Sequence, residues 1–324
     1  MSITGRSALI TALALAVGIL ASSLFLQQYY LYVAIECLLF GLFAMSLDII
    51  VGYAGIVSFG HAAFFGLGAY AVGLTLLHVS TSLWAAVGIA CGLGVLLSLA
   101  IGSCSIKARG VYFAIVTLAF AEIMYRVCNI WQPVTGGSDG LFGFEIPKLS
   151  FPGLPPVSLE VHRHLYYFVA AVVIISYLIS WKLINSPFGW TMQGIRENEE
   201  RVRTMGYHVE GYKVTAFAIS AFFATLSGGL YVLLSGFASP DLLYFVLSGQ
   251  VLIMVIVGGM GTLIGPLLGG IFFTVLQEVT SSIFARGYFI IVGLVLILMV
   301  LFLPGGLASL LRKRTKVAAM HAGH

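Results

Sequence analysis

Ten apolar runs, each near the length that crosses a lipid bilayer, limit this chain to one kind of architecture. A helix needs about 20 apolar residues to span a hydrocarbon core about 30 Å thick. Of the 324 residues, 60% are hydrophobic and only 9% are charged, whereas a soluble domain needs a more polar exterior. We therefore expect a single all-α bundle over residues 1–324, with about ten spans that include broken or re-entrant helices. The expected spans are 7–26, 29–50, 56–78, 82–104, 110–130, 165–184, 213–235, 243–258, 263–283 and 287–303.

The placement of Lys and Arg between these runs predicts the orientation of the bundle. With a cytoplasmic N-terminus, twelve of the sixteen basic residues face the cytoplasm, in line with the positive-inside rule. An even number of spans then leaves both termini inside. Arg6 precedes run 7–26 as in a signal peptide, but the run is long and no A-x-A cleavage site follows, so we expect an uncleaved first span. The basic residues left outside are Arg126, Lys148, Arg163 and Arg286.

Three polar segments connect or follow the spans in this topology. Residues 131–164 form an extracytoplasmic loop rich in Pro, Gly and Ser, which predicts turns and a short interfacial helix. This loop is either a contact surface for an external partner or a linker between two halves of the bundle. Residues 185–212 form a charged cytoplasmic loop, and residues 304–324 form a cytoplasmic tail.

Two glycine-rich stretches interrupt the plain helical pattern, one from Gly52 to His61 and one from Gly258 to Pro266. Irregular backbone at membrane depth is tolerated only where protein or a water-filled path covers it. Both stretches therefore predict discontinuous helices along a substrate path. Tight helix packing through Gly261, Gly265 and Gly269 is the alternative for the second stretch, and hydrogen-bonded packing is the alternative for His61. The candidate path residues are Gly52, Gly55, Ser58, Gly60, His61, Gly258, Gly259, Gly261 and Thr262.

The charged cytoplasmic loop predicts a short helix that lies along the membrane. Ser186 suits a helix cap, Pro187 suits the first helical position, and Gly206 ends the helix after Met205. Acid-first pairs four residues apart, Glu197 with Arg201 and Glu199 with Arg203, would support this helix. Such a helix fits a groove on a soluble partner, although a solvated helix without a partner is the alternative. Its expected apolar anchors are Trp190, Met192, Ile195, Val202 and Met205.

Four acidic residues fall within or at the edges of apolar runs. These residues, Glu36, Asp48, Glu122 and Glu278, must face protein, water or a partner, because an unpaired charge in lipid is costly. Glu122 lies one helical turn before Arg126, so we favour a structural ion pair over a proton relay.

The sequence lacks the signatures of several other classes. The four cysteines lie in or beside apolar runs without CxxC spacing, which is typical of lipid-buried thiols rather than metal ligands. No G-x-x-x-x-G-K-[ST] or H-E-x-x-H motif occurs, so we expect no ATPase site and no enzyme activity in this chain. The scattered basic residues form no stripe, which argues against nucleic-acid binding.

Short strings spread over nearly the whole chain together carry a family resemblance. They are Gly52-Tyr53-Ala54-Gly55 to Gly60-His61, Gly110-Val111-Tyr112-Phe113-Ala114, Thr135-Gly136-Gly137-Ser138-Asp139-Gly140, Gly194-Ile195-Arg196-Glu197-Asn198-Glu199, Met205-Gly206, Lys213 to Ala224, and Pro304-Gly305-Gly306-Leu307. In these strings the chain resembles the branched-chain amino acid ABC transporter permeases of the LivM type. The resemblance implies a bacterial inner-membrane location and four kinds of neighbour: two cytoplasmic ATP-binding subunits, a homologous second permease, an external substrate-binding protein and the lipid bilayer.

The resemblance also implies roles for residues of the charged loop. Contact with the ATP-binding subunits would fall on Gly194, Ile195, Arg196, Glu197, Asn198, Glu199, Arg203, Met205 and Gly206. ATP would be bound by those subunits, so this chain would need no cofactor. The expected function is import of branched-chain or other hydrophobic amino acids. Urea, amide or aromatic-acid import within the same family is the first alternative, an ion-coupled secondary transporter the second, and a lipid-modifying membrane enzyme the last.

Overall fold

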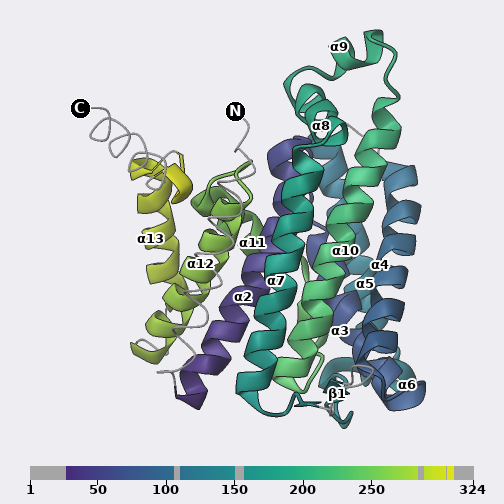
Figure 1. The fold of residues 1–324 in the computed structure, drawn as a ribbon, viewed down its shortest axis with the longest axis vertical. Coiled ribbons are helices and arrows are strands. Elements are labelled where there is room, and N and C mark those ends of the chain that lie inside the picture. The colour runs from purple at the N-terminus through teal and green to yellow at the C-terminus, as the bar shows by residue number, and fades with distance from the viewer. Residues whose placement is uncertain (1–26, 106–109, 150–156, 284–287, 304, 310–324) are drawn as a thin grey trace.

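The computed structural model describes residues 27–105, 110–149, 157–283, 288–303 and 305–309 (Figure 1). These residues form a helical bundle in which seven helices are long and apolar enough to cross a membrane. In chain order the main helices are α2 (Gln28–Asp48), α3 (His61–His78), α4 (Leu83–Ser105), α5 (Val111–Ile130), α7 (His162–Ile184), α10 (Val209–Ser235), α11 (Phe245–Gly258), α12 (Ile264–Ile283) and α13 (Tyr288–Phe302).

Nine of the ten expected spans coincide with these helices, and the all-α fold is confirmed. The expected span 7–26 lies outside the described residues. Two of the nine helices, α11 and α13, are shorter than a usual span, with 14 and 15 residues. The agreement has a physical basis, because a helix is the structure that satisfies every backbone polar group of a single apolar segment inside lipid.

Short elements occupy the two ends of the bundle (Figure 1). At the end opposite α8 and α9, residues 131–158 contain a short helix, as expected, and also a two-stranded antiparallel sheet that the sequence did not predict. The bridge between Leu141 and Ala238 ties this loop to the chain after α10. The remaining elements are η1 (Ile49–Tyr53), α6 (Gln132–Thr135), η2 (Gly137–Asp139), β1 (Lys148–Leu149), β2 (Val157–Ser158), α8 (Pro187–Glu197), α9 (Glu199–Thr204) and η3 (Pro240–Leu243).

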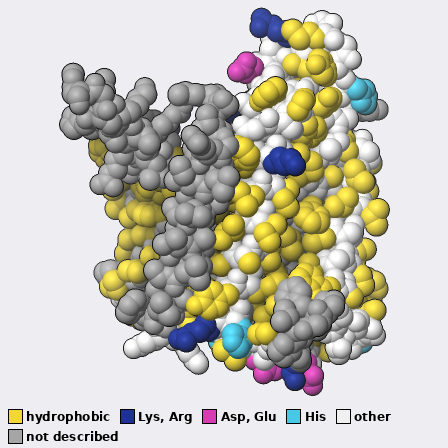
Figure 2. Space-filling model, viewed as in Figure 1, with side chains coloured by type: hydrophobic (Ala, Val, Ile, Leu, Met, Phe, Trp, Pro, Cys, Tyr) yellow, Lys and Arg dark blue, Asp and Glu magenta, His cyan; other side chains and the backbone are white. Residues whose placement is uncertain are grey.

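Helices α2, α3 and α10 form the centre of the bundle. Helix α10 packs against α2, α3 and α4, and α2 packs against α7 and α12. Small residues allow the closest approaches: a Cβ atom at Gly228 of α10 would overlap the backbone of Phe65 in α3. Such contacts replace the missing hydrophobic driving force between helices in lipid. In Figure 2 hydrophobic side chains dominate the middle of the visible face, whereas acidic side chains and histidines lie toward its two ends.

Both glycine-rich stretches interrupt helices, as the sequence predicted. The first follows α2 through one π-helical turn, η1, and leaves residues 54–60 without regular structure before α3 begins. Within it, the Ile56 nitrogen donates to the Ile50 carbonyl at 2.9 Å. The second stretch separates α11 from α12 by the turn Gly259–Leu263. The breaks are therefore built differently, one as a long irregular segment and the other as a tight turn.

Candidate coupling and translocation site

The charged loop, residues 185–212, folds into two helices instead of the single helix that the sequence predicted. Ser186 caps α8, because its hydroxyl accepts a hydrogen bond from the Gly189 nitrogen at 3.5 Å. Asn198 then adopts an extended backbone, with φ −158°, and caps α9 by accepting from the Arg201 nitrogen at 3.0 Å. This break removes the helical spacing that would have paired Glu197 with Arg201, and no ion pair joins these two described side chains. The expected end at Gly206 is confirmed, with φ +89°.

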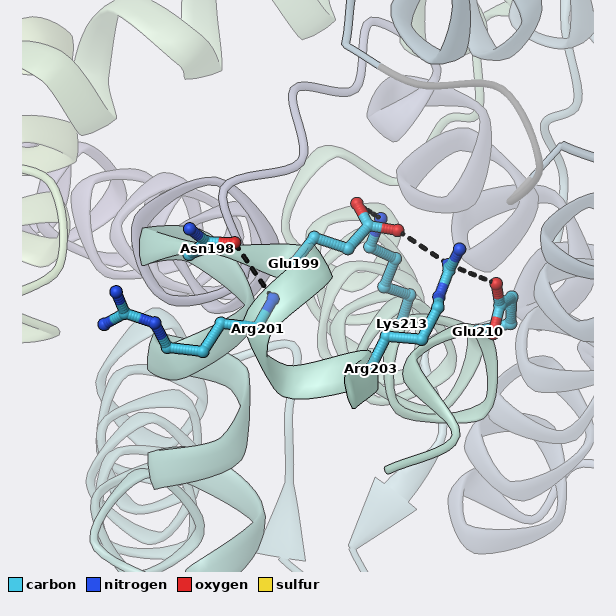
Figure 3. A network of polar contacts seen from close by, with 6 residues as sticks. All are labelled: Asn198, Glu199, Arg201, Arg203, Glu210 and Lys213. Carbon is cyan, nitrogen blue, oxygen red and sulfur yellow. Dashed lines mark hydrogen bonds and ion pairs between the residues drawn. The ribbon is translucent and has the colours of Figure 1, made fainter. Parts of the chain in front are cut away.

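An ion network fastens α9 to the start of α10 (Figure 3). Glu199 pairs with Arg203 at 3.1 Å, as predicted, and also with Lys213 at 2.7 Å. Arg203 pairs in addition with Glu210 at 2.5 Å. Lys213 is only 8% exposed, so its pair with Glu199 is poorly screened by solvent. The Arg201 side chain points away from this network (Figure 3).

A small apolar core lies beneath the ion network. Ile195 of α8, Val202 of α9 and Val209 of α10 are buried against one another. Gly194 is close to this core, because a Cβ atom there would lie 3.3 Å from Val202. We call residues 187–213 the charged lobe. Its ion network and its own core together make it a compact unit rather than a loose loop.

Three of the five expected anchors of this segment are buried, and two are not. Met192, Ile195 and Val202 lie inside, at 1%, 4% and 8% exposure. Trp190 and Met205 are 62% and 66% exposed, so they do not pack inside the chain, and a role as membrane anchors stays a prediction for both. Arg201 is exposed as well.

Asp48 joins the two glycine-rich breaks. It ends α2, is fully buried, and accepts hydrogen bonds from the backbone nitrogens of Gly261 at 2.8 Å and Leu263 at 3.3 Å. Leu263 is the one non-glycine residue in the described ranges with a positive φ, +56°. A non-glycine residue holds such a conformation only where its surroundings fix it. The Asp48 carboxylate supplies that constraint, and we call this contact the Asp48 clasp.

Arg196 connects the charged lobe to the Asp48 clasp. Its Nη1 donates a hydrogen bond to the Gly52 carbonyl, and its side chain lies beside Gly55 and Gly261. A Cβ atom at Gly52 would overlap the Asp48 carboxylate, which explains the need for glycine there. The structure thus brings together one predicted coupling residue, Arg196, and three predicted path residues from both breaks.

His61 and Ser58 lie deeper in the bundle, away from Arg196. His61 is fully buried, stacks on Phe43 with ring centroids 5.5 Å apart, and lies 2.9 Å from the Ser46 hydroxyl through Nε2. Its Nδ1 has no hydrogen-bond partner among the described residues. Ser58 is buried and accepts from the Gly60 nitrogen at 3.3 Å. These surroundings agree with hydrogen-bonded packing, and a place on the substrate path stays a prediction for both residues.

The second break combines a turn with close helix packing. Thr262 donates to the Gly259 carbonyl at 2.7 Å and accepts from the Gly265 nitrogen at 3.1 Å, which stabilises the turn. A Cβ atom at Gly265 or at Gly269 would overlap the backbone of α11. Two of the three glycines proposed for a packing face therefore make it, while Gly261 belongs to the turn. Whether Gly258 and Gly259 also line a path stays a prediction.

The sequence alone did not indicate two of the contacts that build this site. Asp48 was recognised as a charge that needs a partner, but its partners lie 213 and 215 residues away and are backbone groups. Lys213 was read as the start of a span, although it completes the ion network. Within the described residues no group of three or more His, Cys, Asp or Glu side chains is placed to hold a metal ion.

Comparison with known proteins places these features in one family. Residues 29–303 match the family described as branched-chain amino acid transport system, permease component. The chain is 28% identical to the high-affinity branched-chain amino acid transport system permease protein LivM of Escherichia coli K12, over 88% of this chain and 71% of that protein. It is 26% identical to the probable branched-chain amino acid transport permease protein LivM of Methanocaldococcus jannaschii, over 74% of this chain and 78% of that protein.

Another relative matches a shorter part of the chain. The autoinducer 2 import system permease protein LsrC of Escherichia coli O9:H4 is 26% identical over 46% of this chain and 47% of that protein. No solved structure gave a significant match. The family match covers both glycine-rich breaks, the charged lobe and the Asp48 clasp. The chain belongs to the permease-component family of branched-chain amino acid transport systems.

Proposed function

We propose that this chain is the membrane-spanning permease subunit of an ABC importer for branched-chain or other hydrophobic amino acids. The observation that carries the proposal is the contact of Arg196 with Gly52, one helical turn from the Asp48 clasp. Through this contact, one side chain of the charged lobe reaches both breaks in the membrane helices. A displacement of the charged lobe would therefore move the segments that flank the proposed path.

The lobe is suited to transmit a displacement because it is stiff. Its apolar core and the Glu199 ion network hold α8, α9 and the start of α10 in one arrangement. A partner that binds Trp190, Arg201 and Met205 would move this unit as a whole. Rigid-body motion about packed interfaces is a common basis of such two-state changes. ATP hydrolysis would take place on that partner, since the family is a permease component.

The remaining partners follow from the same proposal. Two ATP-binding subunits would dock on the lobes of this chain and of a homologous second permease. An external binding protein would deliver substrate to the opposite end, where the described residues 131–149 and 157–158 include α6 and the β1–β2 sheet. The complex would lie in the bacterial inner membrane with both termini of this chain in the cytoplasm.

The structure offers little support for an ion-coupled secondary transporter. Such a transporter needs acidic groups free to exchange protons, for which Asp48 and Glu122 were the candidates. Asp48 is engaged by two backbone donors, and Glu122 pairs with Arg126 at 2.8 Å. Both carboxylates therefore have structural roles.

Affinity purification of the tagged chain from its native membrane, followed by mass spectrometry, tests the proposal. We expect ATP-binding subunits and a second permease to co-purify, and the reconstituted complex to import leucine only with ATP. Arg201→Glu with Met205→Glu should lower recovery of the ATP-binding subunits at least five-fold. Arg163→Glu, an exposed arginine at the other end of the bundle, should leave recovery unchanged.

Two outcomes would contradict this reading. Transport by the chain alone in liposomes, without ATP, would identify a secondary transporter. Import of urea or an aromatic acid in place of leucine would keep the importer and change its substrate class.

A further inference from the structure

After α13 the chain turns and comes back to the second glycine-rich break. We call the described residues 305–309 the return segment. Gly306 makes the turn, with φ +67°, and its nitrogen donates to the Leu303 carbonyl at 2.8 Å. Ser309 closes the turn, because its nitrogen donates to the Gly306 carbonyl at 3.0 Å and its hydroxyl donates to the same carbonyl at 2.7 Å. The segment includes Gly305, Gly306 and Leu307 of a string that carries part of the family resemblance but has no assigned role.

The return segment caps the end of α11. The last four carbonyls of a helix have no partner inside that helix. One of these carbonyls, on Val257, accepts a hydrogen bond from the Leu307 nitrogen at 2.9 Å. Val257 is buried, and a buried carbonyl without a donor is costly. Leu307 therefore stabilises the last turn of α11 from a segment about 50 residues further along the chain.

Glycine on both sides brings the two backbones into contact. A Cβ atom at Gly306 would lie 2.5 Å from the Gly259 Cα atom, and a Cβ atom at Gly259 would lie 2.9 Å from the Gly305 carbonyl oxygen. Gly306 is buried in this contact. Such an approach leaves no room for a side chain at Gly306, so a single methyl group there would force the backbones apart.

The turn between α11 and α12 is thus held at its two ends by different parts of the molecule. The return segment holds the start of the turn, at Gly259. The Asp48 clasp holds the end of the turn, at Gly261 and Leu263. Arg196 of the charged lobe also reaches this end, since its side chain lies beside Gly261.

A turn that is held at both ends transmits a displacement instead of absorbing it. A displacement of the charged lobe arrives at the end of the turn through Arg196. With a free start, the last turn of α11 would unwind and take up the displacement, because helix ends fray readily. With a fixed start, the displacement reaches α12, which packs against α2 and α13. Helix α13 lies beside α12 at the edge of the bundle (Figure 1).

We propose that Gly306 and Leu307 are positioning residues for transport. They hold the start of the turn, so that movement of the charged lobe shifts α12 instead of loosening α11. Neither residue needs to touch the substrate, since both act through the backbone of Val257 and Gly259. The inference rests on the proposed function, in which an ATP-binding subunit displaces the charged lobe.

Two glycine variants test the backbone contact. Gly306→Ala and Gly236→Ala both place a methyl group at φ +67°, but no atom lies within 4 Å of the Cβ position at Gly236. The measurement is the number of leucine molecules imported per ATP hydrolysed by the reconstituted complex with its ATP-binding subunits. Gly306→Ala should lower this ratio at least five-fold, whereas Gly236→Ala should keep it within two-fold of wild type. A folding defect alone would lower the amount of complex and leave the ratio unchanged, and equal ratios in the two variants overturn the proposal.

A second pair of variants tests the hydrogen bond and keeps the proposal testable if Gly306→Ala does not fold. Leu307→Pro removes the N–H donor to Val257, whereas Leu307→Ala keeps it. The ratio of leucine to ATP should fall at least three-fold in Leu307→Pro and stay within two-fold of wild type in Leu307→Ala. Equal ratios in these two variants would show that the donor has no part in transport, which overturns the proposal.

Hydrogen exchange identifies the cause of any loss. In Gly306→Ala and in Leu307→Pro, the backbone amides of the last turn of α11 should exchange at least five-fold faster than in wild type. The amides of α3 should be unchanged. A lower ratio of leucine to ATP without faster exchange in α11 overturns the proposal, because the loss would then not pass through the end of that helix.

The wild-type complex separates this inference from the proposed function. If it imports leucine with ATP, and Gly306→Ala and Leu307→Pro import as much per ATP, the importer stands and the positioning role is overturned. If the wild-type complex shows no ATP-driven import, the proposed function fails, and the positioning role fails with it.

Discussion

The irregular segment after Tyr53 and the turn between α11 and α12 lie against each other, yet they use glycine in opposite ways. In the first, residues 54–60 lengthen the connection, and Gly55 and Val57 are exposed. In the second, Gly258, Gly265 and Gly269 bring two helix backbones into contact. Glycine density predicts that a helix is interrupted. The neighbouring backbone decides whether the interruption is open or closed.

Among the variants that test this comparison, removal of the Asp48 carboxylate should lower the free energy of unfolding most. Asp48→Ala leaves two backbone donors, on the partly buried Gly261 and the buried Leu263, without an acceptor. Each such group costs about 1–3 kcal/mol, so we expect the free energy of unfolding to fall by about 4 kcal/mol. Titration with SDS in mixed micelles measures this change.

Ser58→Ala is the matched control for that variant in the open break. Ser58 is equally buried, but its hydroxyl accepts only one backbone hydrogen bond, at 3.3 Å. We expect a loss of about 1 kcal/mol. Equal losses in the two variants would show that Asp48 is not the main constraint between the breaks.

A methyl group inside the closed break should have the next largest effect. In Gly265→Ala the new Cβ atom would overlap the carbonyl of Gly258, so α11 and α12 must separate. Overpacking of this kind costs about 1–3 kcal/mol. Gly92→Ala on α4 provides the control, because no atom lies within 4 Å of its Cβ position. That control should gain about 0.5 kcal/mol from helix propensity, and a gain in both variants would refute close packing.

The open break should tolerate the same change better. Gly55 has φ +71°, so Gly55→Ala costs about 1 kcal/mol of backbone strain. Gly110→Ala also places a side chain at a positive φ, +57°, but has no neighbour within 4 Å. Beyond this shared cost, Gly55→Ala presses on the Arg196 side chain, whose nearest atom would lie 2.9 Å away. We therefore expect weaker coupling of ATP hydrolysis to transport in Gly55→Ala alone, and equal coupling in both would dismiss the Arg196 contact.

The sequence predicted the local features of this molecule well. Apolar run length located nine helices, glycine density located both breaks, and helical spacing predicted the pairs Glu122 with Arg126 and Glu199 with Arg203. Each of these depends on residues within a few turns of one another. The break at Asn198 escaped prediction because asparagine suits a helix cap as well as a helix surface.

Contacts between distant segments could not be predicted in the same way. No periodicity relates Asp48 to the backbone of Gly261, and none relates Arg196 to the Gly52 carbonyl. The sequence showed only that a charge at Asp48 needed a partner. A backbone donor has no sequence signature, so the partner became visible only in the folded chain. The functional assignments of the candidate residues stay predictions until the variants above are measured.

The Asp48 clasp also has a consequence for the order in which the chain matures. Its two halves are separated by 213 residues, and a chain is synthesised from its N-terminus. Helix α2 therefore enters the bilayer with an aspartate that has no final partner until α11 and the following turn have been made. The closure of so long a loop comes late, because its entropic cost must be offset by contacts that already exist. A chain truncated before Gly261 would lack both backbone donors that this carboxylate uses in the complete chain.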